Sequence, residues 1–238
     1  MGAFIDQRLP EDETREPILR SPMIVNVFIL AFIAVHVVTH EFLDEATFGN
    51  FLLNFAMIPE RVMSPAAMLQ GPVWIPPWAT LLTYAFLHGD YMHLTFNVMW
   101  FMIFGTAVAR RVGDVRFLGL LVVTVLGAAV THLIVYWGST APVVGVSGAV
   151  SGLMGAAFRF ILPNPEPGTS WPPPALPLFS RPVVTMTLVW SVLNIALGVI
   201  GLTPDGIGYP IAWEAHLGGY FTGLLLFPLF DRRRGWLR

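Results

Sequence analysis

The amino-acid sequence predicts an all-α polytopic membrane protein in which six transmembrane helices form one bundle. Of its 238 residues, 55% are hydrophobic and only 12% are charged, whereas a soluble globular chain carries about 25% charged residues because its surface must be solvated. The mean hydropathy is +0.67. Several charge-free apolar runs also approach the roughly 20 residues that a helix needs to cross the hydrocarbon core. Much of the molecular surface is therefore expected to face lipid.

Six apolar runs set the predicted transmembrane helices. They extend from Met23 to Thr39, Tyr91 to Ala109, Phe117 to Trp137, Val146 to Leu162, Val183 to Leu202 and Ile211 to Phe230. The fourth run is rich in glycine and carries Arg159 near its end, and this side chain is expected to snorkel to an interface. The run from Ala46 to Ile58 has about 13 residues, which is too few to span a bilayer and is typical of an interfacial or re-entrant segment.

The other segments are arranged around a membrane domain of residues 23–230. Residues 1–22 form a polar N-terminal segment, and residues 231–238 form a basic tail. Residues 41–90 form an external loop rich in Phe, Met, Trp and Pro, which is expected to lie at the level of the lipid headgroups. Residues 163–182 contain eight prolines, which indicates a stiff linker rather than a helix or a strand.

The arginines predict the orientation of the bundle, because lysine is absent and all 13 basic residues are arginine. With six spans, Arg61 falls on one side and the other twelve fall on the opposite side, namely Arg8, Arg15, Arg20, Arg110, Arg111, Arg116, Arg159, Arg181, Arg232, Arg233, Arg234 and Arg238. The positive-inside rule then places both termini in the cytoplasm. This orientation favours a bacterial inner membrane as the location.

Composition excludes several kinds of site. Cysteine is absent, which excludes disulfides, thiolate zinc sites, iron–sulfur ligation and a cysteine nucleophile. A formal net charge of -2 argues against nucleic-acid binding. His36 and His40 share a helical face, but no third metal ligand is evident, so no metal and no cofactor are predicted.

Three polar motifs lie inside the predicted membrane helices, where polar side chains are costly and are functional candidates. His93 and Asn97 lie on one face of the second helix, Ser147 opens the fourth helix, and His216 lies near the start of the sixth. These three helices run in the same direction, and each motif falls within the first turn or two. The motifs are therefore expected to share one depth below the external face.

Small residues allow two of these motifs to meet. Gly148 and Gly152 on the fourth helix and Gly219 and Gly223 on the sixth form faces on which two backbones approach closely. His216 precedes Gly219 by three residues and so lies on the packing face. Ser147 and His216 are therefore expected to reach hydrogen-bond distance.

A serine beside a neutral histidine can act as a nucleophile, because the imidazole accepts the hydroxyl proton. Free backbone N–H groups at the start of the fourth helix, together with His93 and Asn97, would stabilise the oxyanion that forms on attack. No carboxylate is evident as a third member, because Glu214 points to a different face of its helix from His216, so a dyad is predicted. Ser151, one turn further on, is a rival nucleophile.

Taken together, these residues resemble the rhomboid family of intramembrane serine proteases. The resemblance rests on Gly145-Val146-Ser147-Gly148 for the family's GxSG, on His93 to Asn97 for its HxxxN, and on His216 with Gly219 and Gly223 for its histidine followed by GxxxG. It covers roughly Trp78 to Phe230. Each motif alone is weak, but the set is specific. Three positions depart from the family pattern: Ala79 follows Trp78, Ala109 stands in place of a frequent Glu, and Ser151 stands in place of a frequent Tyr.

The resemblance implies a six-helix rhomboid-like bundle that cleaves transmembrane segments of membrane-anchored proteins near the external face. It assigns Ser147 as nucleophile and His216 as general base, with His93, Asn97 and the Ser147 N–H as the oxyanion hole. The expected partners are transmembrane protein substrates and the lipid bilayer. Two alternatives stay open: a non-catalytic relative that binds transmembrane helices, and a histidine-based transporter. The lack of internal repeats and of deep carboxylates argues against the transporter.

Overall fold

The computed structural model describes residues 21–64, 73–162, 174–200 and 212–231, and this part of the chain is helical. Its one β feature is an isolated bridge between Met57 and Val143. Most of the predicted N-terminal segment (1–22) and of the basic tail (231–238) lies outside the described residues, as does part of the proline-rich linker (163–182).

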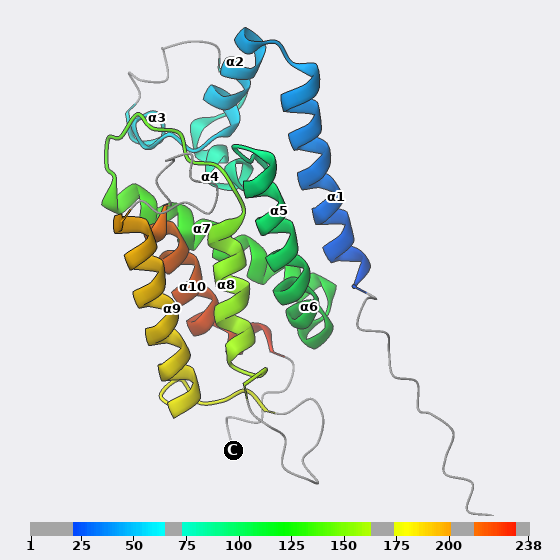
Figure 1. The fold of residues 1–238 in the computed structure, drawn as a ribbon, viewed down its shortest axis with the longest axis vertical. Coiled ribbons are helices and arrows are strands. Elements are labelled where there is room, and N and C mark those ends of the chain that lie inside the picture. The colour runs from blue at the N-terminus through cyan, green and yellow to red at the C-terminus, as the bar shows by residue number, and fades with distance from the viewer. Residues whose placement is uncertain (1–20, 65–72, 163–173, 201–211, 232–238) are drawn as a thin grey trace, which may run out of the picture.

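The helical elements follow one another in the order seen in Figure 1. They are α1 (Met23–Val37), η1 (Val38–Phe42), α2 (Glu45–Phe55), α3 (Pro59–Met63), η3 (Pro77–Ala79), α4 (Thr80–Thr83), η4 (Tyr84–Phe86), α5 (Tyr91–Trp100), η5 (Phe101–Gly105), α6 (Thr106–Val112), α7 (Asp114–Val135), α8 (Ser147–Phe158), α9 (Arg181–Ile200) and α10 (Trp213–Phe230).

Four continuous helices are long and apolar enough to cross a membrane, counting only the described residues. They cover Met23–Phe42, Tyr91–Val112, Asp114–Val135 and Arg181–Ile200, and they correspond to the first, second, third and fifth predicted spans. The fourth predicted span is a shorter apolar helix, Ser147–Phe158, and the sixth is the 18-residue α10. The structure therefore agrees with an all-helical membrane bundle without establishing six complete spans.

The short helix α2 covers most of the run that was predicted to be interfacial or re-entrant. Asp44 caps its first turn, because the carboxylate accepts a 2.7 Å hydrogen bond from the N–H of Thr47. With 11 residues, α2 is about 17 Å long, which is about half the thickness of the hydrocarbon core. Figure 1 shows α2 and α3 together at the end of the bundle where α1 finishes.

Helix α10 packs mainly against α8 and α7, while α1 and α9 lie on opposite sides of the bundle in Figure 1. The predicted glycine faces form the contact between α8 and α10. A Cβ on Gly219 would lie 2.6 Å from the carbonyl carbon of Gly148, and one on Gly223 would lie 2.5 Å from that of Gly152. Only glycine fits this distance, because real Cβ atoms essentially never approach other heavy atoms closer than 3.0 Å.

Arg159 does not snorkel as predicted, because its side chain is buried inside the protein. It is 4% exposed, and it donates to the carbonyl oxygens of Leu176 at 2.6 Å and Leu224 at 3.0 Å. Pro228 lies inside α10 and has no N–H to donate to Leu224, four residues earlier. The guanidinium therefore supplies the donor that Pro228 removes, and it links the end of α8 to α10 and to the segment before α9.

The arginines of the described helices are distributed over the two ends of the bundle. Arg110 and Arg111 lie in the last turn of α6, Arg159 follows α8, and Arg181 begins α9. These helix ends are at one end of the bundle, whereas Arg61 lies in α3 at the other (Figure 1). The predicted asymmetry of charge is thus present in the described part of the chain.

Candidate active site

Ser147 and His216 meet where the first turns of α8 and α10 lie side by side. The Ser147 Oγ atom is 2.8 Å from Nε2 of His216. Both residues are of intermediate burial. The close α8–α10 contact at Gly148 and Gly219 fixes this geometry, because each glycine lies one to three residues from a member of the pair.

The backbone before Ser147 presents the serine at the beginning of a helix. Gly145 has a φ of 112°, which side chains other than glycine rarely adopt. Its N–H donates to the carbonyl of Tyr84 at 3.0 Å. Val146 is the N-cap of α8, and its apolar side chain cannot accept hydrogen bonds from the first N–H groups of the helix. The N-cap side chain therefore leaves the first N–H groups of α8 available to another acceptor.

His93 and Asn97 lie next to this turn. The His93 ring packs so close to Gly145 that a Cβ there would be 2.8 Å from its Cε1 and Nε2 atoms, and 3.9 Å from Nδ2 of Asn97. The N–H of His93 donates to the N-cap carboxylate of Asp90 at 2.7 Å, and Nδ2 of Asn97 donates to the carbonyl of His93 at 3.0 Å. The structure thus brings all four predicted polar residues to one region.

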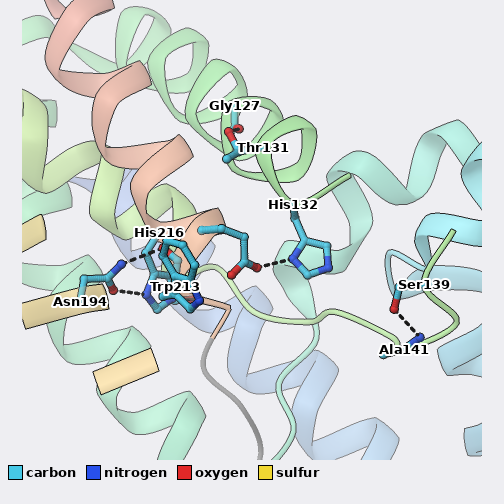
Figure 2. A network of polar contacts seen from close by, with 10 residues as sticks. Gly127, Thr131, His132, Ser139, Ala141, Asn194, Trp213 and His216 are labelled. Carbon is cyan, nitrogen blue, oxygen red and sulfur yellow. Dashed lines mark hydrogen bonds and ion pairs between the residues drawn. The ribbon is translucent and has the colours of Figure 1, made fainter. Parts of the chain in front are cut away.

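Asn194 on α9 is a further member of the site that the sequence analysis did not identify. Figure 2 shows its side chain pointing at His216 and Trp213. The Oδ1 atom is 2.9 Å from Nδ1 of His216, and Nδ2 donates to the carbonyl of Trp213 at 2.7 Å. A lone amide in an apolar membrane helix was the available signal, since such residues are functional candidates by default.

The neighbouring polar residues have other partners. The Oε1 atom of Glu214 is 2.5 Å from Nδ1 of His132 on α7, and Figure 2 marks this contact by the dashed line at the His132 ring. The carboxylate of Glu214 is therefore paired with His132 rather than with His216. The Ser151 hydroxyl, the rival nucleophile, donates to the carbonyl of Ser147 at 2.9 Å. This bond to its own helix is the usual structural role of a membrane serine.

Three more histidines, His36, His40 and His88, lie near His93. The rings of His36 and His40 have centroids 3.9 Å apart and planes tilted by 32°, yet no three His, Asp or Glu side chains among the described residues are arranged to hold a metal ion. His88 precedes α5, and its ring centroid is 5.2 Å from that of His93. Burial, and after it the neighbouring His93, lowers the pKa of His88 to about 3. His88 therefore stays neutral near pH 7 and adds no charge beside the site.

Comparison with known proteins gives a consistent result. The family model for the Rhomboid domain matches residues 76–233. The chain is 28% identical over 177 residues to the rhomboid protease GlpG of Enterobacter sp. (strain 638), covering 74% of this chain and 57% of that protein. It is 30% identical over 149 residues to the rhomboid protease GlpG of Yersinia pestis (strain Pestoides F), covering 61% of this chain and 45% of that protein. The matches thus span about half the length of these relatives.

Proposed function

The chain belongs to the rhomboid family, and from this premise we propose that it is an intramembrane serine endopeptidase that cleaves transmembrane segments of membrane-anchored proteins near the external face. The observation that carries the proposal is the 2.8 Å contact between Ser147 Oγ and His216 Nε2. A serine hydroxyl is a weak nucleophile unless an adjacent base accepts its proton. The relatives named rhomboid protease support the same class of reaction.

In the first half of the proposed reaction, Ser147 Oγ attacks the carbonyl carbon of the scissile peptide bond and its proton passes to Nε2 of His216. The carbonyl oxygen becomes an oxyanion. His93, Asn97 and the N–H of Ser147 stabilise it by hydrogen bonding, and the positive end of the α8 dipole adds to this. The tetrahedral intermediate then breaks its C–N bond, His216 gives the proton to the leaving nitrogen, and an acyl ester remains on Ser147.

In the second half, a water molecule attacks the ester carbonyl and gives its proton to His216. The C–O bond to Ser147 breaks, and the serine oxygen recovers the proton. This step requires water at a site enclosed by membrane helices, which is possible where irregular backbone such as that before α8 lines a water-filled cavity. The reaction needs no metal and no cofactor, because the serine, the histidine and the oxyanion donors supply nucleophile, base and charge stabilisation.

We propose further that α8 and α10 complete a bundle of six transmembrane helices within a domain of residues 23–230, with both termini in the cytoplasm of a bacterial inner membrane. The distribution of arginine supports this orientation, because Arg110, Arg111, Arg159 and Arg181 lie at one end of the described bundle. It places the start of α8, and with it Ser147, on the external side of the bilayer.

The test is labelling of the full-length, detergent-solubilised protein with a fluorescent fluorophosphonate, which reacts with activated serines. We expect the wild-type protein to be labelled, and the Ser147→Ala and His216→Ala variants to lose labelling to a similar degree, because members of a nucleophile–base pair act as a unit. Ser151→Ala is the matched control, since Ser151 lies one turn further along the same helix. It is expected to be labelled like the wild type.

Two results would contradict the proposal. Labelling that persists in Ser147→Ala but disappears in Ser151→Ala would move the nucleophile to Ser151. A folded wild-type protein that is not labelled, and that leaves a transmembrane reporter protein uncut in liposomes, would instead favour a non-catalytic rhomboid protein that binds transmembrane helices.

A further inference from the structure

Helix α9 is the least buried of the four candidate spans, and yet it carries one buried amide. Of the 20 residues of α9, all of them described, only Val183 and Asn194 are buried. Asn194 is 4% exposed, and it lies on the side of α9 that faces the start of α10. Burial of an amide in a membrane helix requires that its donors and acceptors be paired. The buried amide of Asn194 is therefore expected to be hydrogen-bonded through both its oxygen and its nitrogen.

The orientation of the Asn194 amide follows from its contact with Trp213. A backbone carbonyl oxygen can only accept a hydrogen bond, so the atom 2.7 Å from the Trp213 oxygen must be Nδ2. The reverse orientation would place two acceptor oxygens against each other. The side-chain oxygen Oδ1 is therefore the atom that faces Nδ1 of His216, at 2.9 Å.

This orientation also fixes the proton on His216. An amide oxygen cannot donate, so Nδ1 of His216 must carry the hydrogen of the neutral imidazole, and Nε2 must carry the lone pair. Nε2 is the atom 2.8 Å from the Ser147 hydroxyl. The opposite tautomer would place an N–H at the serine, where it could not accept the hydroxyl proton.

We propose that Asn194 is a positioning residue that holds His216 in the tautomer able to accept the proton of Ser147. The carbonyl of Trp213 orients Asn194, Asn194 orients His216, and His216 faces the serine. The inference rests on the proposed function, because the tautomer matters only if His216 acts as a base. It adds to the dyad expected from the sequence a positioning residue supplied by α9.

The contact also makes the state of His216 depend on where α9 lies. Gly198, one turn after Asn194, packs against Trp213 so closely that a Cβ would lie 2.6 Å from the Trp213 Cβ. Elsewhere α9 is joined to α10 by the contact between the Thr187 hydroxyl and the Tyr220 hydroxyl, which are 2.9 Å apart. Movement of the C-terminal end of α9 away from α10 would break the hydrogen bond between Asn194 and His216 and leave both tautomers of His216 accessible.

The experiment reads the tautomer directly, by 15N NMR of the full-length protein labelled at histidine, with the His216 signals identified by their loss in His216→Ala. The wild-type protein is expected to show a protonated Nδ1 and an unprotonated Nε2. Asn194→Leu keeps the volume of the side chain and removes both polar groups, so it is expected to give a mixture of tautomers. Its fluorophosphonate labelling is expected to be about tenfold slower, which corresponds to about 1.4 kcal/mol.

Two further variants separate positioning from general packing of α9. Asn194→Asp keeps an acceptor oxygen opposite Nδ1 but loses the donor to the Trp213 carbonyl, so it is expected to keep the hydrogen on Nδ1 while weakening the contact between α9 and α10. Thr187→Val removes a separate α9–α10 hydrogen bond, to Tyr220, without touching the histidine, and it is expected to retain both the tautomer and the wild-type labelling rate. An unchanged His216 spectrum in Asn194→Leu would overturn the proposal, and so would an equal effect of Thr187→Val.

The result for Asn194 can be distinguished from the result for the proposed function. If the tautomer depends on Asn194 but the wild-type protein is not labelled by fluorophosphonate, the positioning role stands and the protease activity fails. If the wild-type protein is labelled but the tautomer does not depend on Asn194, the protease proposal stands and the positioning role fails.

Discussion

Gly219→Ala should increase the distance between Ser147 and His216 without changing either residue. A Cβ on Gly219 would lie 2.6 Å from the carbonyl carbon of Gly148 and closer still to its oxygen. Both are backbone atoms, so no side-chain rotation can relieve the overlap. To restore 3.0 Å, α8 and α10 must move apart by roughly 1 Å, since a close-packed interface has no free volume to absorb the methyl group.

The displacement acts directly on the proposed nucleophile and base, because Gly148 follows Ser147 and Gly219 lies three residues after His216. A separation of about 1 Å would lengthen the 2.8 Å contact beyond 3.5 Å, where it no longer counts as a hydrogen bond. Misplacement by about 1 Å can cost roughly 100-fold in rate, which is about 2.7 kcal/mol of transition-state stabilisation. Overpacking should also lower the free energy of unfolding by about 1–3 kcal/mol.

The assay is the rate of fluorophosphonate labelling, measured alongside the melting temperature in detergent. Gly49→Ala is the control glycine substitution, since a Cβ there meets no heavy atom within 4 Å, and it is expected to label like the wild type. Wild-type labelling by Gly219→Ala at an unchanged melting temperature would refute the reasoning, because it would mean that the close α8–α10 contact does not set the position of His216.

Three further outcomes are expected from the same site. Asn97→Ala should slow cleavage of a transmembrane reporter less than Ser147→Ala does, because one oxyanion donor is lost and the nucleophile remains; an equal loss would undercut the oxyanion role. Cleavage should fall as the pH is lowered and His216 takes up a proton, because a protonated imidazole cannot accept the serine proton; a flat rate down to about pH 4 would contradict a histidine base. Gly145→Ala should impair labelling, because its Cβ would lie 2.8 Å from the His93 ring and its φ of 112° suits glycine; normal labelling would show that His93 need not lie against this turn.

The helical segments were predictable because each is encoded by a continuous apolar run. The predicted span starting at Met23 agrees with α1 and η1 together, which end at Phe42, and the predicted span starting at Tyr91 agrees with a helix ending at Val112. The fourth run was predicted to extend to Leu162, but α8 ends at Phe158. Helix ends are harder to predict than helix centres, because they depend on which partners satisfy the terminal backbone groups.

The proximity of Ser147 and His216 was also within reach of the sequence. Glycines four residues apart define a face on which two helices can touch, and the serine and the histidine lie beside those faces. The position of His93 against the turn before Ser147 was not predictable in detail, because it depends on the φ of 112° at Gly145. The prediction that Arg159 snorkels to an interface was wrong, because its two acceptors are supplied by distant segments: the carbonyl of Leu176, and the carbonyl of Leu224 that Pro228 leaves without a helical donor.

The sequence by itself determined the class of protein, the apolar helices and the polar residues that converge below one face, since composition, helical periodicity and motif spacing are local properties of the chain. Only the tertiary structure decided which partner each polar group meets. Asn194 is 22 residues from His216, and His132 is 82 residues from Glu214. Such pairings depend on how each helix is rotated about its axis and on the depth at which it packs, and no spacing along a single helix encodes either quantity.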